Sequence, residues 1–140
     1  MIIKETALAD EAISIVETKF GNLYFFDQFL ITEIFEGESL GSKEFKRIFA
    51  LADDCYGKNK PIGLISHRIF PYAVNVFELI PLSKNFENVI ANAVVAYTDI
   101  SLKNFELEQK LLAFKGKFFN NLDSAIEWIK KEVKKNNKTI

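Results

Sequence analysis

The stretch KPIGLISHRIFPYAVN, residues 60–75, decides the fold more than any other part of the chain. After Pro61 comes an apolar run, Ile62 to Ser66, without the polar alternation of a half-exposed strand, as expected of a parallel strand covered on both faces. The run ends at His67 and Arg68, and His67 is the only histidine in the chain. We therefore predict a buried parallel strand with a candidate site at its carboxyl end.

A second unbroken apolar run, VIANAVVAY at 89–97, predicts a neighbouring parallel strand. Between the two runs we expect a loop and a short helix over 75–82, weakened by Pro81. The second run leads into Tyr97-Thr98-Asp99, and ligands favour the edge where parallel strands end. The candidate ligand-binding or partner-binding residues at that edge are Ser66, His67, Arg68, Tyr72, Thr98 and Asp99.

The N-terminal part, residues 12–36, is rich in β-branched and aromatic residues and predicts consecutive antiparallel strands, broken at Gly21-Asn22 and near Asp27-Gln28. The following segment predicts a helix capped by Ser42 and ended by Gly57. Its apolar stripe repeats every 3.6 residues and contains Phe45, Ile48, Phe49, Ala52, Cys55 and Tyr56. We therefore expect the Cys55 thiol to be buried.

The C-terminal part predicts a helix over 101–113, a short edge strand over 115–119 and a last helix capped by Asn121. The apolar stripe of the last helix contains Leu122, Ala125, Ile126, Ile129 and Val133. The order of elements predicts one α/β domain over residues 1–140, with its core at 13–133 and a polar tail at 134–140. Its mixed β-sheet starts with antiparallel strands and continues through right-handed β-α-β crossovers.

Composition restricts the classes of function. The chain has 140 residues and a formal net charge of −1, so it has no general attraction to nucleic acid. One cysteine and one histidine cannot build a zinc site, and no glycine-rich phosphate loop is present. We therefore expect no metal and no cofactor. No apolar run is long enough to cross a membrane, and neither a signal peptide nor a disulfide is indicated, so we expect a cytoplasmic protein.

The order of elements, together with KPIGLISHRIFPYAV at 60–74 and FFNNLDSAIEWI at 118–129, resembles the SpoIIAA-like group of STAS-like domains, which are related in fold to Sec14 lipid-binding modules. STAS anti-sigma-factor antagonists act without catalysis by docking to a partner kinase. They carry a phosphorylatable serine at the start of the helix after a central strand. This chain departs from that pattern, because no serine or threonine lies between Ser66 and Asn75.

The strand end at residues 66–68 admits several kinds of chemistry. Ser66 and His67 make a poor nucleophile and base, because neighbouring residues in a strand point to opposite faces. A structural His67 would bond a loop carbonyl or Asp99. The planar donors of Arg68, with the hydroxyl of Tyr72, suit a carboxylate or phosphate. The alternative function is therefore a binding module for a small anionic ligand, a nucleotide or a lipid.

The aromatic segment LYFFDQFLITEIF at 23–35 leaves two alternatives open. Its rings either lie under the helices or form an exposed sheet edge for a homodimer. With no catalytic constellation in the sequence, the leading hypothesis is a non-enzymatic STAS-like interaction or regulatory domain with an undefined protein partner. We expect the imidazole of His67 and the guanidinium of Arg68 to meet solvent together at the partner surface.

Overall fold

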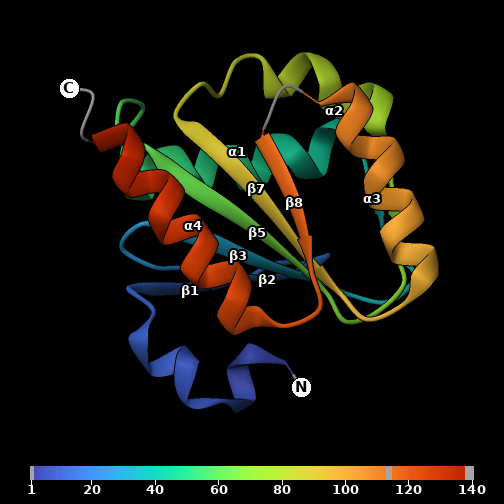
Figure 1. Ribbon diagram of the computed structural model, residues 1–140, viewed down its shortest axis with the longest axis horizontal. Helices are drawn as coiled ribbons and strands as arrows, with labels where there is room; N and C mark the ends of the chain where they lie inside the picture. Colours follow the sequence, from blue (N-terminus) through green and yellow to red (C-terminus); the bar gives the residue numbers. More distant parts are fainter. Residues whose placement is uncertain (1, 113–114, 138–140) are drawn as a thin grey trace.

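The computed structural model describes residues 2–112 and 115–137, which build one six-stranded sheet in the order β1-β2-β3-β5-β7-β8 (Figure 1). The strands are β1 Ser14–Glu17, β2 Gly21–Phe25, β3 Phe29–Ile34, β5 Ile62–Arg68, β7 Val89–Ala96 and β8 Lys115–Phe119. The pairs β1/β2 and β2/β3 are antiparallel, and every later pair is parallel. The predicted mixed α/β sheet is therefore confirmed.

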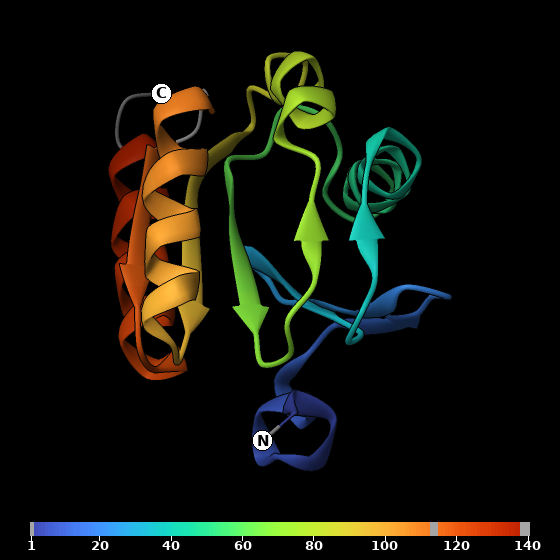
Figure 2. The ribbon, with the colours of Figure 1, turned by 90° about the vertical axis from the view of Figure 1, so that its right-hand side faces the viewer.

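Four α-helices and a small second sheet accompany the main sheet. They are α1 Ser42–Tyr56, α2 Val76–Ser83, α3 Asp99–Leu111 and α4 Leu122–Asn137, with β4 Ser39–Leu40 paired to β6 Ala73–Val74. Figure 2 shows α1 and α4 on opposite sides of the sheet. Two 3₁₀ turns, Ile3–Glu5 and Ala7–Glu11, precede β1 on the α4 side. No helical turns were predicted at these residues.

The sheet face under α4 is closely packed. Ala91 and Ala93 of β7 are fully buried there, together with Ile129 of α4. A Cβ atom on Gly63 would lie only 2.3 Å from Cγ2 of Ile129. Small residues on β5 and β7 therefore let α4 approach the sheet closely.

The opposite face packs against α1, whose stripe Phe45, Ile48, Phe49 and Ala52 is buried as predicted. Gly57 ends the helix with a φ of 77°, also as predicted, but the N-cap is Gly41 and not Ser42. The prediction for Cys55 is wrong, because its thiol is exposed. Tyr56 takes the inward position of the last turn and donates its hydroxyl to the carbonyl of Phe26 at 2.6 Å.

Several element boundaries differ from the prediction. β5 continues two residues beyond Ser66, so His67 and Arg68 belong to the strand. The first break falls before Gly21, because the Thr18 hydroxyl bonds the Gly21 backbone and turns the chain there. Helix α3 begins at Asp99, and the predicted end of that helix at Ala113 lies outside the described residues. Residues 138–140 of the predicted tail also lie outside them.

The N-terminal aromatic rings lie inside the molecule. Tyr24, Phe25, Phe26 and Phe29 are at most 4% exposed, and within 23–35 only Phe35 has a large exposed side chain. These rings fill both layers of the core, since β2 and β3 are covered on both faces. The alternative in which these rings lie under the helices is therefore confirmed, and a homodimer stays a prediction that would need other surface residues.

Candidate functional site

The carboxyl ends of β3, β5 and β7 lie side by side. Ser66 is in register with Thr32 of β3, and Arg68 with Ala96 of β7. The loops after β3 and β5 are also joined, because the amide of Gly37 donates to the carbonyl of Pro71 at 3.0 Å. The strand ends predicted from the sequence therefore meet at one edge of the sheet.

His67 lies inside this edge and not in solvent. It is 2% exposed, and its Nδ1 lies 2.7 Å from a carboxylate oxygen of Glu33. Its Nε2 lies 2.7 Å from the hydroxyl oxygen of Tyr97. The prediction of an exposed imidazole is wrong, because β5 continues through this residue and turns it toward the α4 face. Its partners are Glu33 and Tyr97 in place of the expected loop carbonyl or Asp99.

Glu33 is held in the core by the N-terminal segment. The side chain is buried, and the backbone amide of Ile3 donates to both of its oxygens, at 3.0 and 3.2 Å. Next to it, the amide of Lys4 donates to the Tyr24 hydroxyl at 3.2 Å. Burial, and then the charge of Glu33, raise the pKa of Tyr24 to about 12. The N-terminal turn thus covers the Glu33–His67 pair.

For a neutral imidazole beside an ionised Glu33, the partners assign the proton positions in this chain of side chains. A carboxylate only accepts, so Nδ1 of His67 carries the proton that it donates to Glu33. Nε2 is then free to accept the proton of the Tyr97 hydroxyl. Tyr97 is 54% exposed, and burial, followed by the charge of Glu33, raises its pKa. A hydroxyl–imidazole–carboxylate chain therefore runs from the surface into the core.

A cleft of about 110 Å³ adjoins this chain at the ends of β3 and β5. Its walls are mainly apolar, and His67 and Glu33 supply the ionisable part. The lining residues are Ile2, Asn22, Glu33, Ile34, Phe35, His67, Ile69 and Phe70. The cleft thus offers a short apolar group a place beside the imidazole.

Arg68 faces the opposite side of the sheet from His67. Its Nη1 and Nη2 donate to the two carboxylate oxygens of Glu108, at 2.9 and 3.2 Å. The guanidinium carbon also lies 5.6 Å from the centre of the Tyr72 ring. Burial by itself lowers the pKa of Arg68, but Tyr72 and Glu108 raise it by more, so the pKa of Arg68 is raised overall. The prediction that imidazole and guanidinium share one solvent-exposed surface is wrong, and the arginine charge is already compensated by Glu108.

Arg68 also lines a cavity of about 50 Å³ between the sheet and helices α1, α2 and α3. Ser66 and Asn92 bring further polar groups to its mainly apolar wall. Neither Nε of Arg68 nor Oδ1 of Asn92 has a hydrogen-bond partner within the described chain. The volume is well below the roughly 300–1,000 Å³ of pockets for drug-sized ligands. A nucleotide or lipid does not fit this cavity as it stands.

The other predicted residues have mainly structural surroundings. The Thr98 hydroxyl accepts from the amide of Ser101 at 3.2 Å and so caps α3, and Asp99 is the exposed first residue of that helix. Ser66 lines the cavity on the face opposite His67, so these two neighbours share no proton, as expected. Over 2–112 and 115–137 no cluster of three or more potential metal ligands occurs. No helix in these ranges is long and apolar enough to span a membrane.

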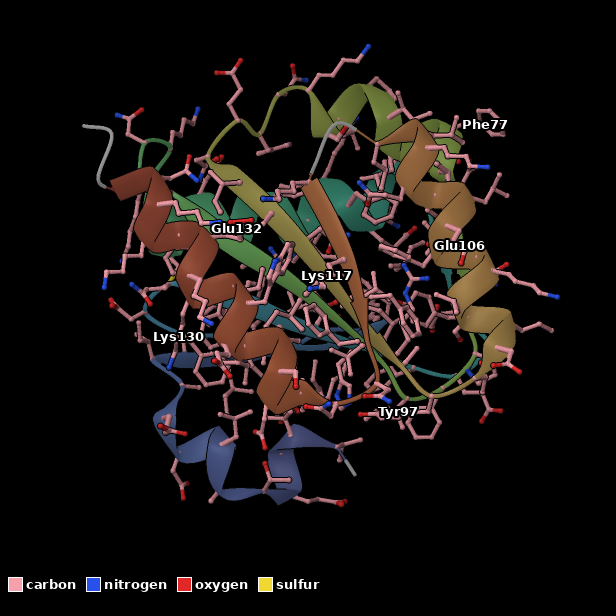
Figure 3. All side chains as sticks on the ribbon, viewed as in Figure 1. Phe77, Tyr97, Glu106, Lys117, Lys130 and Glu132 are labelled. Atoms are coloured by element: carbon pink, nitrogen blue, oxygen red, sulfur yellow. The ribbon has the colours of Figure 1, made fainter. Side chains whose placement is uncertain are left out.

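Exposed apolar side chains follow each of the three adjacent strand ends. They are Phe35 after β3, Phe70 after β5, and Tyr97 and Ile100 after β7, with exposed fractions of 40, 41, 54 and 71%. We call these four residues the apolar rim. Figure 3 shows Tyr97 at the strand ends. Other exposed apolar side chains lie just before β1 and on β1, α2 and α3, namely Ile13, Ile15, Phe77, Leu107 and Leu111.

Sequence reasoning identified His67 and Arg68 as candidates but left out Tyr97, although it lies at the predicted strand end, and it missed the acidic side chains that His67 and Arg68 bond. Glu33 and Glu108 lie 34 and 40 residues away from the side chains that they bond. A signal for Glu33 was present, because it shares one side of its strand with Phe29 and Ile31, which are buried. A carboxylate on a buried strand face requires a buried partner. Glu108 of α3 had no comparable signal.

Comparison with known proteins supports the fold and leaves the function open. No protein-family model matches the chain, and no curated protein does. One solved structure is similar, an uncharacterised protein of the DUF3478 family with a SpoIIAA-like fold from Shewanella loihica PV-4. The two chains are 14% identical, the match covers 84% of this chain and 92% of the other, and the TM-score is 0.54. The chain therefore has a SpoIIAA-like fold, as the sequence resemblance implied.

Proposed function

We propose that this protein is an interaction module that docks another protein on the apolar rim. The observation that carries the proposal is the row of exposed apolar side chains after three neighbouring strands. Contiguous exposed apolar surface rimmed by polar residues marks interaction sites, and aromatic side chains dominate the binding energy of protein interfaces. The four rim residues, Phe35, Phe70, Tyr97 and Ile100, are the expected anchors.

The charges next to the rim indicate what kind of partner fits. Glu36 follows Phe35 and Asp99 precedes Ile100, and both acids are exposed. Arg68, two residues before Phe70, is already paired with Glu108. An apolar surface flanked by basic residues complements this arrangement. A second copy docked rim to rim would place like charges together, so the proposed partner is a different protein.

The alternative of a small anionic ligand has less support. Its main cation would be Arg68, whose guanidinium makes two bonds to the Glu108 carboxylate. An anion at this position would have to displace that carboxylate.

The single exposed thiol of Cys55 fits a reducing compartment, so we propose that the interaction takes place in the cytoplasm.

Capture with surface variants tests the docking site. The wild type, Phe70→Ser, Ile100→Ser and Phe77→Ser are immobilised and exposed to extract of the source organism, and bound proteins are quantified by mass spectrometry. We expect the captured amount of a protein that binds the wild type to fall about tenfold or more with either rim variant. Loss of an anchor weakens the free energy of binding by at least about 1.4 kcal/mol.

Phe77→Ser is the matched control, because Phe77 is 78% exposed and lies at the opposite end of the molecule from Tyr97 in Figure 3. It should retain the bound protein. Circular dichroism and unfolding curves confirm that each variant is folded. Loss of binding with Phe77→Ser but not with the rim variants would place docking on α2 and contradict the proposal. Wild-type self-association that the rim variants abolish would identify a second copy as the partner instead.

A further inference from the structure

The chain from Tyr97 to Glu33 has the geometry by which proteins activate a weak hydroxyl nucleophile. A hydroxyl bonded to an imidazole, which is in turn oriented by a buried carboxylate, recurs at unrelated catalytic sites. Here both joining distances are 2.7 Å. His67 and Glu33 are buried, whereas Tyr97 reaches the surface. We infer that Tyr97 is an acyl acceptor that takes a short acyl group from an activated ester or thioester, with His67 as general base.

Exposure distinguishes Tyr97 from the three other tyrosines of the chain. Tyr24 is fully buried, and the Tyr56 hydroxyl donates to two backbone carbonyls at 2.6 and 2.8 Å. The ring of Tyr72 lies against the guanidinium of Arg68. Of the four, Tyr97 alone combines an exposed side chain with a base on its hydroxyl.

The base is needed because the hydroxyl does not ionise readily by itself. Burial and the negative charge of Glu33 raise the pKa of Tyr97, so the phenol keeps its proton near neutral pH. With a general base, the phenol does not have to ionise first, because the base accepts the proton while the new bond forms. Nε2 of His67 is already within hydrogen-bond distance of the phenol oxygen.

The adjoining cleft indicates the class of acyl group. It measures about 110 Å³ and is mainly apolar, and its wall includes His67, the partner of the Tyr97 hydroxyl, but not Tyr97 itself. A dry cavity of about 150 Å³ holds benzene in another protein, so this cleft has room for an acyl chain of only a few carbons. The rim residues Phe35 and Phe70 also line it.

The proposed step balances without an oxidant or a reductant. The phenol oxygen of Tyr97 attacks the acyl carbon, and a carbon–oxygen bond forms. The bond from that carbon to the thiol or alcohol leaving group breaks. The phenol proton passes to Nε2 of His67 and then to the leaving group. Glu33 stabilises the imidazolium that exists between the two transfers, and the product is a tyrosyl ester.

The test uses the purified chain and p-nitrophenyl acetate as the acyl donor. Acetylation is measured by mass spectrometry of the peptide that contains Tyr97, so that reaction at lysines is counted separately. We expect Tyr97 to be acetylated about 100-fold faster than N-acetyltyrosinamide at pH 7, as a positioned base provides. Butyrate should react similarly, whereas decanoate should not, because its chain exceeds the cleft.

His67→Gln should lower the rate at Tyr97 about 100-fold, and Lys60→Ala, at the other end of the strands, should leave it unchanged. Glu33 is a positioning residue, so Glu33→Gln should lower the rate and also change its pH profile. A purely structural role for Glu33 would change stability without moving that profile. If His67→Gln does not fold, the comparison with N-acetyltyrosinamide decides alone.

A rate at Tyr97 no higher than that of N-acetyltyrosinamide would overturn the inference. An unchanged rate in folded His67→Gln would also overturn it. Because the assay contains no partner protein, its failure would leave the docking proposal standing, and loss of docking would leave this inference standing.

Discussion

The two ends of the same parallel strands present different surfaces. At the carboxyl ends lies the apolar rim, with Glu36 and Asp99 beside it. The loops that lead into β3, β5 and β7 contain exposed Asp27, Lys58 to Lys60, and Glu87. The ammonium of Lys60 pairs with Asp27 at 3.3 Å in these loops. One end is therefore apolar and the other is an ordinary hydrated surface.

The difference between the two ends of the strands indicates that the sheet architecture alone does not produce the apolar rim. Both sets of loops connect the same strands, yet exposed aromatic rings follow the carboxyl ends and are absent from the loops that lead into β3, β5 and β7, although Phe77 of α2 is exposed. Exposed apolar surface favours aggregation, so its presence requires a reason. The polar loops show that this fold is built without such exposure. The docking proposed for the carboxyl end provides that reason.

The largest expected effect concerns the ion pair that joins α3 to β5 below the rim. Arg68→Met leaves the Glu108 carboxylate without its partner, which costs about 3–5 kcal/mol for a fully buried pair. The two side chains are 14 and 10% exposed, so we expect a loss near the lower end of that range. Urea unfolding of the variant and the wild type measures it.

The double variant Arg68→Met with Glu108→Leu should recover most of the lost free energy of unfolding, because no unpaired charge remains. A single variant as stable as the wild type would show that this pair does not hold the carboxyl end together. A double variant as unstable as the single would assign the loss to packing and not to charge.

A smaller effect of opposite sign is expected for Asn92→Leu, in the wall of the cavity under α1, α2 and α3. The substitution removes an amide whose oxygen has no partner, and it fills apolar space. Such changes commonly stabilise by about 0.5–2 kcal/mol. The increase should appear as a higher urea midpoint. A decrease would show that the amide makes a bond essential to this face.

Alkaline pH should weaken the attachment of the N-terminal turn that covers Glu33. In the folded state the pKa of Tyr24 is raised to about 12 from its ordinary value of 10.0, so the folded chain keeps this proton to higher pH. Between pH 10 and 12 the unfolded chain therefore loses this proton first, and the free energy of unfolding falls as pH rises. Tyr24→Phe should show a shallower fall across that window. Parallel curves for the two proteins would contradict this.

The smallest effect is expected at the polar end. Lys60→Ala removes an exposed pair with Asp27, whose side chain is 84% exposed. Exposed pairs contribute about 0.2–1 kcal/mol when they contribute at all, and salt reduces that further. We expect a change below about 0.5 kcal/mol in urea unfolding. A loss above 1 kcal/mol would mean that this end is also structurally specialised.

The spacing of apolar residues along the chain predicted those helices and strands in which the apolar residues are the buried ones. The apolar runs of β5 and β7 gave parallel strands, and the stripe beginning at Phe45 gave α1. The pattern failed at Cys55, where the last helical turn places Tyr56 inward and the thiol outward. Periodicity fixes the stripe, but the end of a helix depends on what lies opposite its last turn.

The sequence predicted where the candidate site lies but not which side chains form its hydrogen bonds. Strand order at one edge places residues 66–68 next to residues 97–99 in any fold of this class. Whether His67 meets solvent depends on the N-terminal turn and on Glu33, which are far from it in sequence. Long-range hydrogen bonds of this kind leave no periodic signal, so only the folded arrangement reveals them.

Photo-crosslinking at the two ends tests the central claim most directly. The photoreactive residue p-benzoylphenylalanine replaces Phe70 at the rim in one protein and Lys60 at the polar end in another. Both proteins are irradiated in living cells of the source organism. The account predicts a defined crosslinked protein from position 70 and none from position 60. The same crosslinked protein from position 60, or crosslinking from that position alone, would contradict it.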